Sequence, residues 1–530
     1  MQDNDRRPSI WAPLRQPLFR TIWIMSLVSN IGTWMQEIGG GWLMASLTTS
    51  PALIGLLETA LTLPLFILSL PAGALADILD KRRILIATQT WMTLFAAAMG
   101  IITLLGGMSP ALLLTLTFVL SIGSAVNGPP WQAILPEIIE RKDLPAAVAL
   151  GSVGFNLARA IGPALGGAII VALGPGATFL FNALSFLGVI IVLYRWKRDH
   201  HASVLPAERM MSAMRAGIRY ARHAPMLQAV LVRTLAFILF GSAMWALLPF
   251  IAKHELQTDS LGYGILIACF GIGAVLGAAV LTRVQRYYSV DVIVRIATVL
   301  FVVLLLALGI AKTYAVVCCA MLLGGGAWMM LMSSLNVAAQ LATPPWVRAR
   351  AMAIYILVFF GGFAGGAAIW GFLATTKGTT AALLSASLGA LAGMLVTMRF
   401  KLTADTSIDH TPSMHWAEPV IAVEPEHDQG PVMITVEYTI DPADGKAFSK
   451  AIHDLSRIRM RDGAVQWGIF NDVADSRRYI ETFVVESWLE HLRQHERVTI
   501  TDRALEDLVH RFHKGTSPPK VEHFIYQDEN

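Results

Sequence analysis

The chain has few cysteines and few charged residues, and both shortages limit the classes of protein to which it can belong. Its three cysteines, Cys269, Cys318 and Cys319, lie in apolar segments, which argues against a fold held by disulfide bonds. Charged residues make up 15% of the 530 residues, whereas soluble globular proteins average about 25%. Hydrophobic residues make up 55%. This composition indicates a membrane protein with a lipid bilayer around it.

The charge balance gives no sign of nucleic-acid binding. The formal net charge is +4, and the cations of the apolar region lie in short connections between apolar runs. Such cations orient membrane helices, so no nucleic-acid partner is expected. The polar segment 1–17 lacks the pattern of a cleavable signal peptide. We expect it to form a cytoplasmic N-terminus, with the first helix serving as its own signal.

Long apolar runs extend from about residue 18 to 400, and polar breaks divide them into segments long enough to span a bilayer. The predicted helices are 18–47, 52–77, 83–106, 110–138, 145–173, 177–195, 226–252, 260–284, 290–311, 314–341, 347–374 and 379–400. The sequence thus predicts an all-α polytopic membrane domain of about twelve transmembrane helices. Its two six-helix halves are 18–195 and 226–400, joined by a basic central loop, 196–225.

Lysine and arginine are distributed unevenly between the two sets of connections. One set includes Lys81 to Arg83 and the central loop 196–225, whereas the opposite set holds only Lys253, Lys312 and Lys377. Cytoplasmic loops are the ones enriched in lysine and arginine. We therefore expect a multi-pass protein of the cell (inner) membrane with both termini in the cytoplasm.

The connection between the second and third predicted helices joins small residues, one acid and three cations, Lys81, Arg82 and Arg83. It resembles the motif G-x-L-A-D-R-x-G-R-K/R of the major facilitator superfamily. The matching positions are Gly73, Leu75, Asp77, Lys81 and Arg82. Two positions depart from the motif, because Ile78 replaces an arginine and Asp80 a glycine.

The resemblance implies that this connection is a gating element. Asp77 is expected to meet the N-terminal end of a helix in the other half when the transporter faces outward, and to leave it when the cytoplasmic side opens. Lys81, Arg82 and Arg83 would contact interfacial phosphates or acidic partners. Alternatively, the three cations only orient the helices.

The helix predicted at 145–173 is rich in small residues, which allow close helix packing. It contains the group Gly162, Pro163, Gly166 and Gly167. This group resembles the end of a motif found in exporters of the superfamily, although Ala149 and Ala158 replace earlier glycines. An exporter is favoured, and the alternative is a tightly packed helix that carries no information about transport direction.

Three further segments resemble the transmembrane secretion effector group, which includes the enterobactin exporter and drug-efflux homologues. They are Leu63–Asp77, Asn156–Pro163 and Arg348–Ala353, and the resemblance covers residues of about 15–400. It implies a secondary active transporter that exports its substrate by proton antiport, but it does not name the substrate. We expect a small, amphipathic organic compound, drug-like or siderophore-like. The transporter's partners would be the small-molecule substrate and protons, without a cofactor or a catalytic residue.

Charged residues inside predicted spans are candidates for coupling. Glu37 and Glu58 should lie at comparable depth in the outer half, where a carboxyl group in a low dielectric can exchange between charged and neutral forms. They could instead be solvated charges of an outer vestibule. Arg159 lies near the middle of its span and should pair with a carboxylate or carbonyls, or line the cavity. Arg233 is nearer the cytoplasmic edge, where it could snorkel or hold a gate.

Several polar and aromatic residues of the spans could line a substrate cavity. They are Asn30, Trp34, Asn127, Asn156, Asn336 and Gln340. Aromatic walls with few polar groups suit an amphipathic organic molecule, and Asn336 and Gln340 share a helical face. Each asparagine could instead form only an interhelical hydrogen bond.

The sequence changes character after residue 400. Residues 401–430 carry prolines, acids and histidines without an apolar period and form a linker. From 431 to 530 the apolar spacing predicts the order strand–helix–strand–strand–helix–strand of an α+β ferredoxin-like domain. This order resembles the dimeric α+β barrels of the antibiotic-biosynthesis monooxygenase type in pattern, without a catalytic motif.

Several roles remain open for this C-terminal domain and for the whole chain. The domain could form a homodimer, regulate the transporter, or act as a monooxygenase-like enzyme or sensor for the exported compound. The whole chain could also be a membrane-anchored assembly factor. His491 and His495 share a helix face, but no third ligand supports a metal site. A deep pocket would favour an enzyme or sensor, and a filled core would favour dimerisation.

Overall fold

The computed structural model describes residues 11–139, 143–196, 210–344, 346–402, 411, 413–416, 421, 425–426 and 429–527. The chain divides into two compact units. The first unit comprises 1–207, 231–336 and 355–401. The second comprises 208–230, 337–354 and 402–530.

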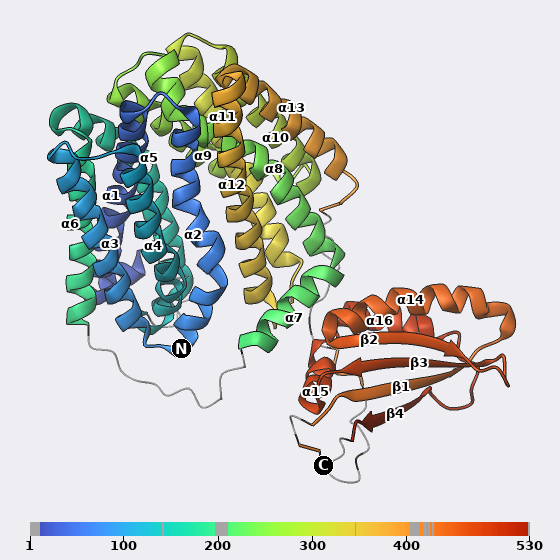
Figure 1. The fold of residues 1–530 in the computed structure, drawn as a ribbon. Coiled ribbons are helices and arrows are strands. Elements are labelled where there is room, and N and C mark those ends of the chain that lie inside the picture. Colours follow the sequence, from blue (N-terminus) through green and yellow to red (C-terminus); the bar gives the residue numbers. More distant parts are fainter. Residues whose placement is uncertain are drawn as a thin grey trace, which may run out of the picture. The chain divides into compact units, whose positions relative to one another are not determined.

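Long helices dominate the chain up to residue 397. They are α1 (Pro17–Leu47), α2 (Pro51–Ile78), α3 (Lys81–Leu104), α4 (Pro110–Ile138), α5 (Leu144–Leu173), α6 (Pro175–Arg195), α8 (Pro225–Phe250), α9 (Ser260–Val284), α10 (Val290–Ile310), α11 (Tyr314–Leu341), α12 (Arg348–Lys377) and α13 (Thr379–Thr397). Figure 1 shows that they run along a common direction as a bundle. Their ends agree with the predicted ends to within a few residues.

Eleven helices of the described residues are long and apolar enough to span a membrane. The expected twelfth, α1, is not among them, although it is 31 residues long. The reason is the polar content of α1, which packs against α5 and α6. Its polar residues include Ser26, Ser29, Asn30, Thr33, Gln36 and Glu37.

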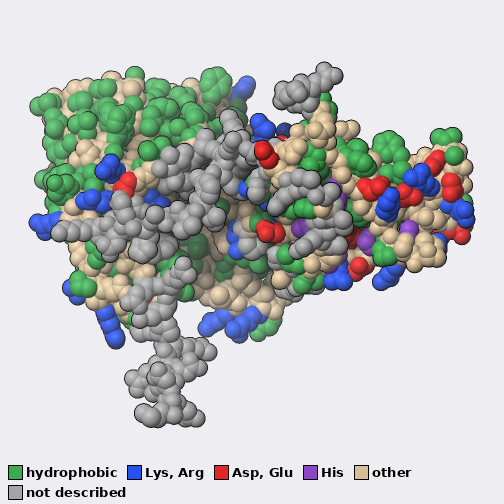
Figure 2. Space-filling model, turned by 90° about the horizontal axis from the view of Figure 1, so that it is seen from below, with side chains coloured by type: hydrophobic (Ala, Val, Ile, Leu, Met, Phe, Trp, Pro, Cys, Tyr) green, Lys and Arg blue, Asp and Glu red, His purple; other side chains and the backbone are tan. Residues whose placement is uncertain are grey.

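The outer surface of the bundle is apolar along its length. Large hydrophobic side chains are well exposed on the helices, including Leu94 on α3, Leu184 on α6 and Leu388 on α13. Figure 2 shows green hydrophobic side chains over the flank of the helical part, and blue lysine and arginine side chains on the end seen from below. A lipid-facing flank with charged ends explains this distribution.

Local sequence accounts for many helix ends. Proline occupies the first helical position of α1, α2, α4 and α6, where its missing N–H group leaves no bond unmade. The Oδ1 atom of Asp80 accepts a hydrogen bond of 2.8 Å from the Arg83 backbone N–H and so caps α3. The predicted central loop also contains a helix that the sequence analysis did not predict, α7 (Met210–His223).

The C-terminal domain confirms the predicted order of strands and helices. The elements are β1 (Val432–Thr439), α14 (Gly445–Asp462), β2 (Ala464–Asn471), β3 (Arg478–Val485), α15 (Trp488–Arg497), α16 (Ile500–His510) and β4 (Lys520–Ile525). The antiparallel sheet has the strand order β2-β3-β1-β4, which is that of a ferredoxin-like fold. Alternate residues of β1, such as Ile434 and Tyr438, are buried against Phe448 and Ile452 of α14.

Candidate functional site

A cavity of about 400 Å³ opens among the first six helices of the bundle. Side chains of α1 to α6 line it, and Phe360 of α12 is its contribution from the second half of the chain. Its walls combine aromatic rings with amides, hydroxyls and two carboxyl groups. The amide and carboxyl side chains are those of Asn30, Gln36, Glu37, Glu58, Gln89, Asn127 and Asn182.

Two hydrogen-bond networks fix the polar wall of this cavity. Asn182 Nδ2 donates to Gln36 Oε1 over 2.8 Å, and this joins α6 to α1. On the other wall, Asn127 Oδ1 accepts bonds from Thr88 Oγ1 at 3.0 Å and Gln89 Nε2 at 3.3 Å. Because buried polar groups are stable only when paired, the networks hold these side chains in place.

Glu37 of α1 and Glu58 of α2 both line the cavity and are half-buried. Neither carboxylate forms an ion pair within 4.0 Å with any other residue that the structure describes. Their charges still act on one another and on Tyr263 of α9, and Arg159 is the cation that acts on Glu37. A carboxyl group without a fixed cation partner in a low dielectric can take up and release a proton.

Arg159 lies between two aromatic rings instead of in an ion pair. Its Cζ atom is 5.6 Å from the ring centre of Trp34 on α1 and 5.4 Å from that of Phe270 on α9. Its Nε atom is buried and has no hydrogen-bond partner among the described residues. The predicted pairing with a carboxylate or carbonyls is therefore not seen, and Arg159 does not line the cavity. A cation–π contact with both halves takes its place.

The structure divides the other predicted cavity residues into two groups. Asn30 and Asn127 line the cavity. Four do not: Trp34, Asn156, Asn336 and Gln340. Trp34 packs against Phe155 with ring centres 6.3 Å apart, and Asn156 donates to the Ser152 carbonyl within its own helix. Asn336 is half-buried and Gln340 exposed on α11.

Sequence reasoning did not single out three of the residues that the structure places at this site. Gln89 and Asn182 line the cavity, and Tyr263 lies near both carboxyl groups. A signal for Asn182 was present, since an amide within an apolar span is costly unless it has a role. Tyr263 had none, because a tyrosine near a helix end is common at membrane interfaces.

Arg233 holds helices together instead of extending toward the helix end. Its Nη2 atom lies 2.7 Å from Asp291 Oδ1 on α10, and its Nε atom donates to the Thr397 carbonyl on α13 over 3.3 Å. Its side chain is only 5% exposed. In this structure Arg233 therefore does not snorkel, since the partly exposed carboxylate of Asp291 and a carbonyl at the end of α13 lie within its reach. A role for Arg233 in a gate stays a prediction.

The helix 2–3 motif makes contacts within the first half of the chain. Lys81 Nζ lies 2.9 Å from Glu137 Oε1 on α4. Arg82 donates to the carbonyls of Leu193 and Tyr194, each over 2.7 Å. These are the last carbonyls of α6, where a cation is favoured by the helix dipole. Lys81 thus pairs with a carboxylate of α4 and Arg82 with the end of α6. A contact of these cations with interfacial phosphates stays a prediction.

The remaining motif residues give less information about gating. Gly73 and Leu75 lie in the last turns of α2, and Arg83 is exposed at the start of α3. The side chain of Asp77 lies outside the part of the chain that the structure describes. Its predicted contact with the other half therefore stays a prediction.

The small-residue motif of α5 lies where helices meet most closely. A Cβ atom on Gly162 would lie 2.6 Å from Trp34 Cβ on α1, and one on Gly167 would lie 2.6 Å from the Ser260 carbonyl oxygen on α9. Pro163 and Gly166 face α9 and α1 in the same way. The motif therefore joins the two halves of the bundle by close packing.

A second close contact between the halves joins α2 to α12. Thr59 Oγ1 donates to the Ala364 carbonyl over 3.0 Å, and a Cβ atom on Gly55 would lie 2.8 Å from the Ala367 carbonyl oxygen. Both this contact and that between Gly167 and Ser260 lie toward the end where α2 and α9 begin. The halves are thus tightly packed at that end of the bundle.

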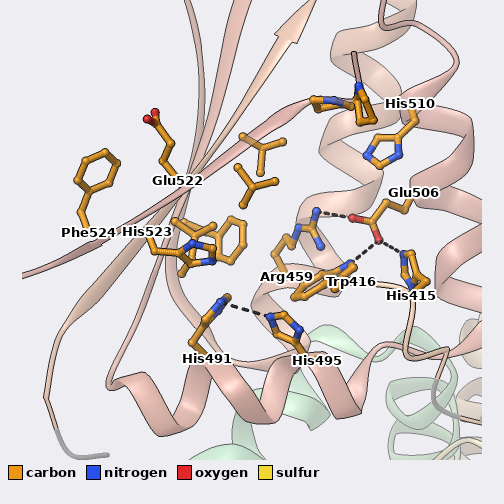
Figure 3. A pocket seen from close by; sticks show the side chains of 16 residues that line it. His415, Trp416, Arg459, His491, His495, Glu506, His510, Glu522, His523 and Phe524 are labelled. Atoms are coloured by element: carbon orange, nitrogen blue, oxygen red, sulfur yellow. Dashed lines mark hydrogen bonds and ion pairs between the residues drawn. The ribbon is translucent and has the colours of Figure 1, made fainter. Parts of the chain in front are cut away.

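A larger cavity, of about 570 Å³, lies in the C-terminal domain (Figure 3). Strands β1, β3 and β4, helices α14 to α16, and His415 and Trp416 contribute to its lining. A pocket in the C-terminal domain is what we expect if this domain is a sensor or an enzyme. His491 and His495 both line it, with their Nε2 atoms 3.4 Å apart. Among the described residues, no group of three or more His, Cys, Asp or Glu could hold a metal ion.

Comparison with known proteins gives a family model and curated relatives. The model described as "Transmembrane secretion effector" matches residues 8–530. The staphyloferrin A transporter of Staphylococcus aureus is 27% identical over 302 residues, which cover 56% of this chain and 75% of the relative. The multidrug efflux pump Tap of Mycolicibacterium fortuitum is 26% identical over 309 residues, which cover 56% and 73%.

Solved structures resemble about three quarters of the chain. A mutant of the nucleoside transporter NupG has a TM-score of 0.59 at 13% identity and covers 72% of this chain and 99% of its own. A POT family transporter in complex with 5-aminolevulinic acid has a TM-score of 0.58 at 13% identity, covering 74% and 97%. At such identities the likeness shows the fold alone.

Proposed function

This chain belongs to the transmembrane secretion effector family of major facilitator transporters, and from that premise we propose that it exports a small, amphipathic organic compound in exchange for protons. That it is an integral membrane transporter of a small molecule follows from the family and the fold. Export, proton exchange and the substrate class are the proposal. The names of two relatives, a staphyloferrin A transporter and a multidrug efflux pump, suggest a siderophore-like or drug-like compound.

One observation carries the proposal: Glu37 and Glu58 face the same cavity, and neither has a cation partner within 4.0 Å among the residues that the structure describes. Proton antiport requires a group that holds a proton in one state and loses it when substrate enters. Two carboxyl groups that line one cavity and act on one another favour a state in which one of them holds a proton, because like charges repel. Entry of the substrate would then displace this proton to the cytoplasm.

The walls of the cavity suit an amphipathic substrate. Trp131, Phe155 and Phe360 offer aromatic surfaces, and Asn30 and Asn127 offer amide groups. Such a mixture buries a flat apolar body while a few polar groups fix its orientation. Within this proposal α1 is the twelfth span, and its polar face is exposed to the cavity instead of to lipid.

The positions of the cations suggest how the protein is oriented in the membrane. The connection with Lys81 and Arg82 would be cytoplasmic, as would both termini, in the cell (inner) membrane. The end where α2 meets α12 and α5 meets α9 would then be the outer end, so that the tightly packed halves close the cavity to the outside. In this state the cavity would receive substrate from the cytoplasm.

Efflux into inverted membrane vesicles tests the proposal. The assay compares drug-like and siderophore-like compounds, with and without a proton gradient, for the unaltered chain, Glu37→Gln and Glu58→Gln. We expect proton-driven exchange to fall at least about tenfold in each variant, the effect of losing a group that must titrate. Glu496→Gln, at an exposed position of the C-terminal domain, is the matched control. Unchanged exchange in Glu37→Gln would remove that residue from the mechanism.

A second candidate function concerns the C-terminal domain. Its cavity of about 570 Å³ favours a sensor or a monooxygenase-like enzyme over a filled dimerisation core. Homodimerisation through this domain stays a separate prediction. Ending the chain after residue 420 separates the roles: retained transport without response to the compound indicates a sensor, whereas lost assembly of the protein indicates a dimerisation module.

A further inference from the structure

The cavity of the C-terminal domain has an apolar wall formed by the sheet. Phe483, Ile434 and His523 are cross-strand neighbours on β3, β1 and β4, and Val436 lies beside Val521 in the same way. All five line the cavity. Side chains on one face of neighbouring strands stand next to one another, so this wall is a continuous flat surface.

Arg459 of α14 closes the opposite side. Its side chain is 3% exposed, and its Cζ atom lies 4.8 Å from the ring centre of Trp416 and 5.1 Å from that of Phe483. Its Nε atom bonds Glu481 Oε1 at 3.2 Å and its Nη2 atom bonds Glu506 Oε1 at 2.9 Å. Figure 3 shows Arg459, Glu506, Trp416 and His415 converging on this side.

The third nitrogen of this guanidinium group has no hydrogen-bond partner in the part of the chain that the structure describes. Arg459 Nη1 is buried and makes no hydrogen bond to any residue that the structure describes. A buried donor left unpaired is destabilising by about 1–3 kcal/mol, and native proteins rarely keep one without a reason. Since Arg459 lines the cavity, an acceptor atom of a bound molecule can fill this place.

The charge around Arg459 disfavours an anion. Two buried carboxylates, Glu481 and Glu506, already face this one cation. Burial alone would raise the pKa of Glu506, but the Arg459 guanidinium and the donors His415 and Trp416 hold that pKa well below its usual range. Glu506 is therefore ionised at neutral pH, and the cation has no excess charge to offer a phosphate or carboxylate.

The histidines of the cavity do not supply positive charge either. Burial and the neighbouring imidazoles lower the pKa of His491 to about 3 and that of His495 to about 4. Burial also lowers the pKa values of His510 and His523. Neutral imidazoles can donate or accept hydrogen bonds without attracting ions. Figure 3 shows His491 and His495 side by side on α15, directed into the cavity.

We propose that this cavity binds an uncharged aromatic molecule that presents a carbonyl-type oxygen to Arg459 Nη1. The sheet wall and Trp416 would enclose the flat body, and the imidazoles would bond its polar edge. The cavity volume of about 570 Å³ lies within the range of roughly 300–1,000 Å³ of small-molecule sites. The site belongs to the C-terminal domain alone and does not depend on transport by the membrane helices.

Calorimetric titration of the full-length protein in lipid nanodiscs tests the proposal. The probes are coumarin, which is flat, uncharged and has a carbonyl oxygen; naphthalene, which lacks the oxygen; tetraphenylphosphonium, a cation; and inorganic phosphate. We expect saturable binding of one coumarin per chain, at least about tenfold tighter than naphthalene, the factor that one charge-assisted hydrogen bond supplies. Preference for tetraphenylphosphonium, binding of phosphate, or no binding of coumarin would overturn the proposal.

Two pairs of variants locate the binding. Val521→Trp fills the cavity from the edge strand β4, where Val521 is 51% exposed, whereas Val473→Trp makes the same change on a fully exposed turn. Coumarin binding should fall at least about tenfold only in Val521→Trp, because the added ring occupies the cavity. Equal binding in the two variants would place the probe elsewhere and contradict the proposal.

Arg459→Lys tests the recognition of the oxygen. Lysine keeps the charge between Glu481 and Glu506 but lacks the planar fork that presents Nη1. Coumarin should lose about tenfold in affinity while naphthalene changes little; equal losses for both probes would contradict recognition through Nη1. Since this substitution can unfold the domain, hydrogen exchange of β1 is measured alongside, and the Val521→Trp pair decides the outcome if β1 is unprotected.

Discussion

The two cavities of this protein both contain carboxyl groups, but they hold them differently. In the C-terminal domain Glu506 lies 2.9 Å from a nitrogen of Arg459 and also accepts bonds from His415 and Trp416. In the membrane helices Glu37 has no cation within 4.0 Å among the described residues, and Arg159 is held instead between two aromatic rings. A fixed partner keeps a carboxylate permanently charged. The absence of one leaves it free to exchange a proton.

Glu506 is thus a charge that stabilises the fold, whereas Glu37 is a candidate for proton exchange. Removing the partner of a paired, buried charge should lower the stability of the fold. Replacing a carboxyl group of the membrane cavity should leave the fold intact and remove transport. The following substitutions test that contrast, beginning with the largest expected change in free energy.

Arg459→Met should have the largest effect on stability. It leaves Glu481 and Glu506 buried without their common cation, and the C-terminal domain should lose about 3–5 kcal/mol of unfolding free energy. Hydrogen exchange of β1 and α14 in the full chain measures this loss. The control is Arg477→Met, whose pair with Asp475 is 3.6 Å long and largely exposed, and which should change stability by less than about 1 kcal/mol. Equal effects would refute the structural role of Arg459.

Within the membrane helices, Arg233→Met should mainly lower stability, whereas Arg159→Met should mainly impair transport. Removing Arg233 breaks its 2.7 Å ion pair with Asp291 and its bond to the Thr397 carbonyl, and should destabilise the bundle by about 3 kcal/mol. Removing Arg159 loses only its ring contacts, about 0.5–2 kcal/mol, but also the cation that acts on Glu37. Thermal unfolding in detergent and vesicle efflux are measured together. A stable Arg159→Met that transports normally would exclude Arg159 from coupling.

Acidification should destabilise the C-terminal domain through its histidines. The folded-state pKa values of His491 and His495, about 3 and 4, lie below the value of about 6.5 in the unfolded chain. Their contribution is therefore complete above about pH 6.5 and is lost as the pH falls toward 4, by at most about 1.4 kcal/mol per pH unit for each group. Hydrogen exchange of α15 at pH 7, 6 and 5 measures the slope. His491→Gln should flatten it, and an unchanged slope would assign the effect to other groups.

Periodicity and length were sufficient to predict most of the fold. The bounds of α9 and α11, for example, agree with the predicted 260–284 and 314–341. The rule that polar groups are costly inside a membrane span also selected Glu37, Glu58, Asn30 and Asn127, all of which line the cavity. Such predictions succeed because they depend on each residue and its neighbours in the chain.

Pairing between distant segments could not be predicted in this way. The helical spacing of the apolar residues places Arg459, which is 3% exposed, on the buried face of α14 and Arg457, which is 67% exposed, off it, but it does not identify Glu481 and Glu506 as the partners of Arg459. Likewise, the contact of Arg82 with the end of α6 depends on how α3 and α6 pack. The C-terminal cavity was missed for the same reason, since residues from seven separate segments form it.

The smallest contrast lies within a single helix, α2, and concerns the closed end of the bundle. A Cβ atom on Gly55 would lie 2.8 Å from a backbone oxygen of α12, whereas one on Gly73 would meet no atom within 4 Å. Gly55→Ala should therefore destabilise the packing of the two halves at that end by about 1 kcal/mol, the lower limit for overpacking. Gly73→Ala should be neutral or slightly stabilising, because alanine favours a helix. Labelling of a cysteine placed at Thr375, beside this contact, measures opening. If both variants label alike, close packing at Gly55 does not hold the end closed.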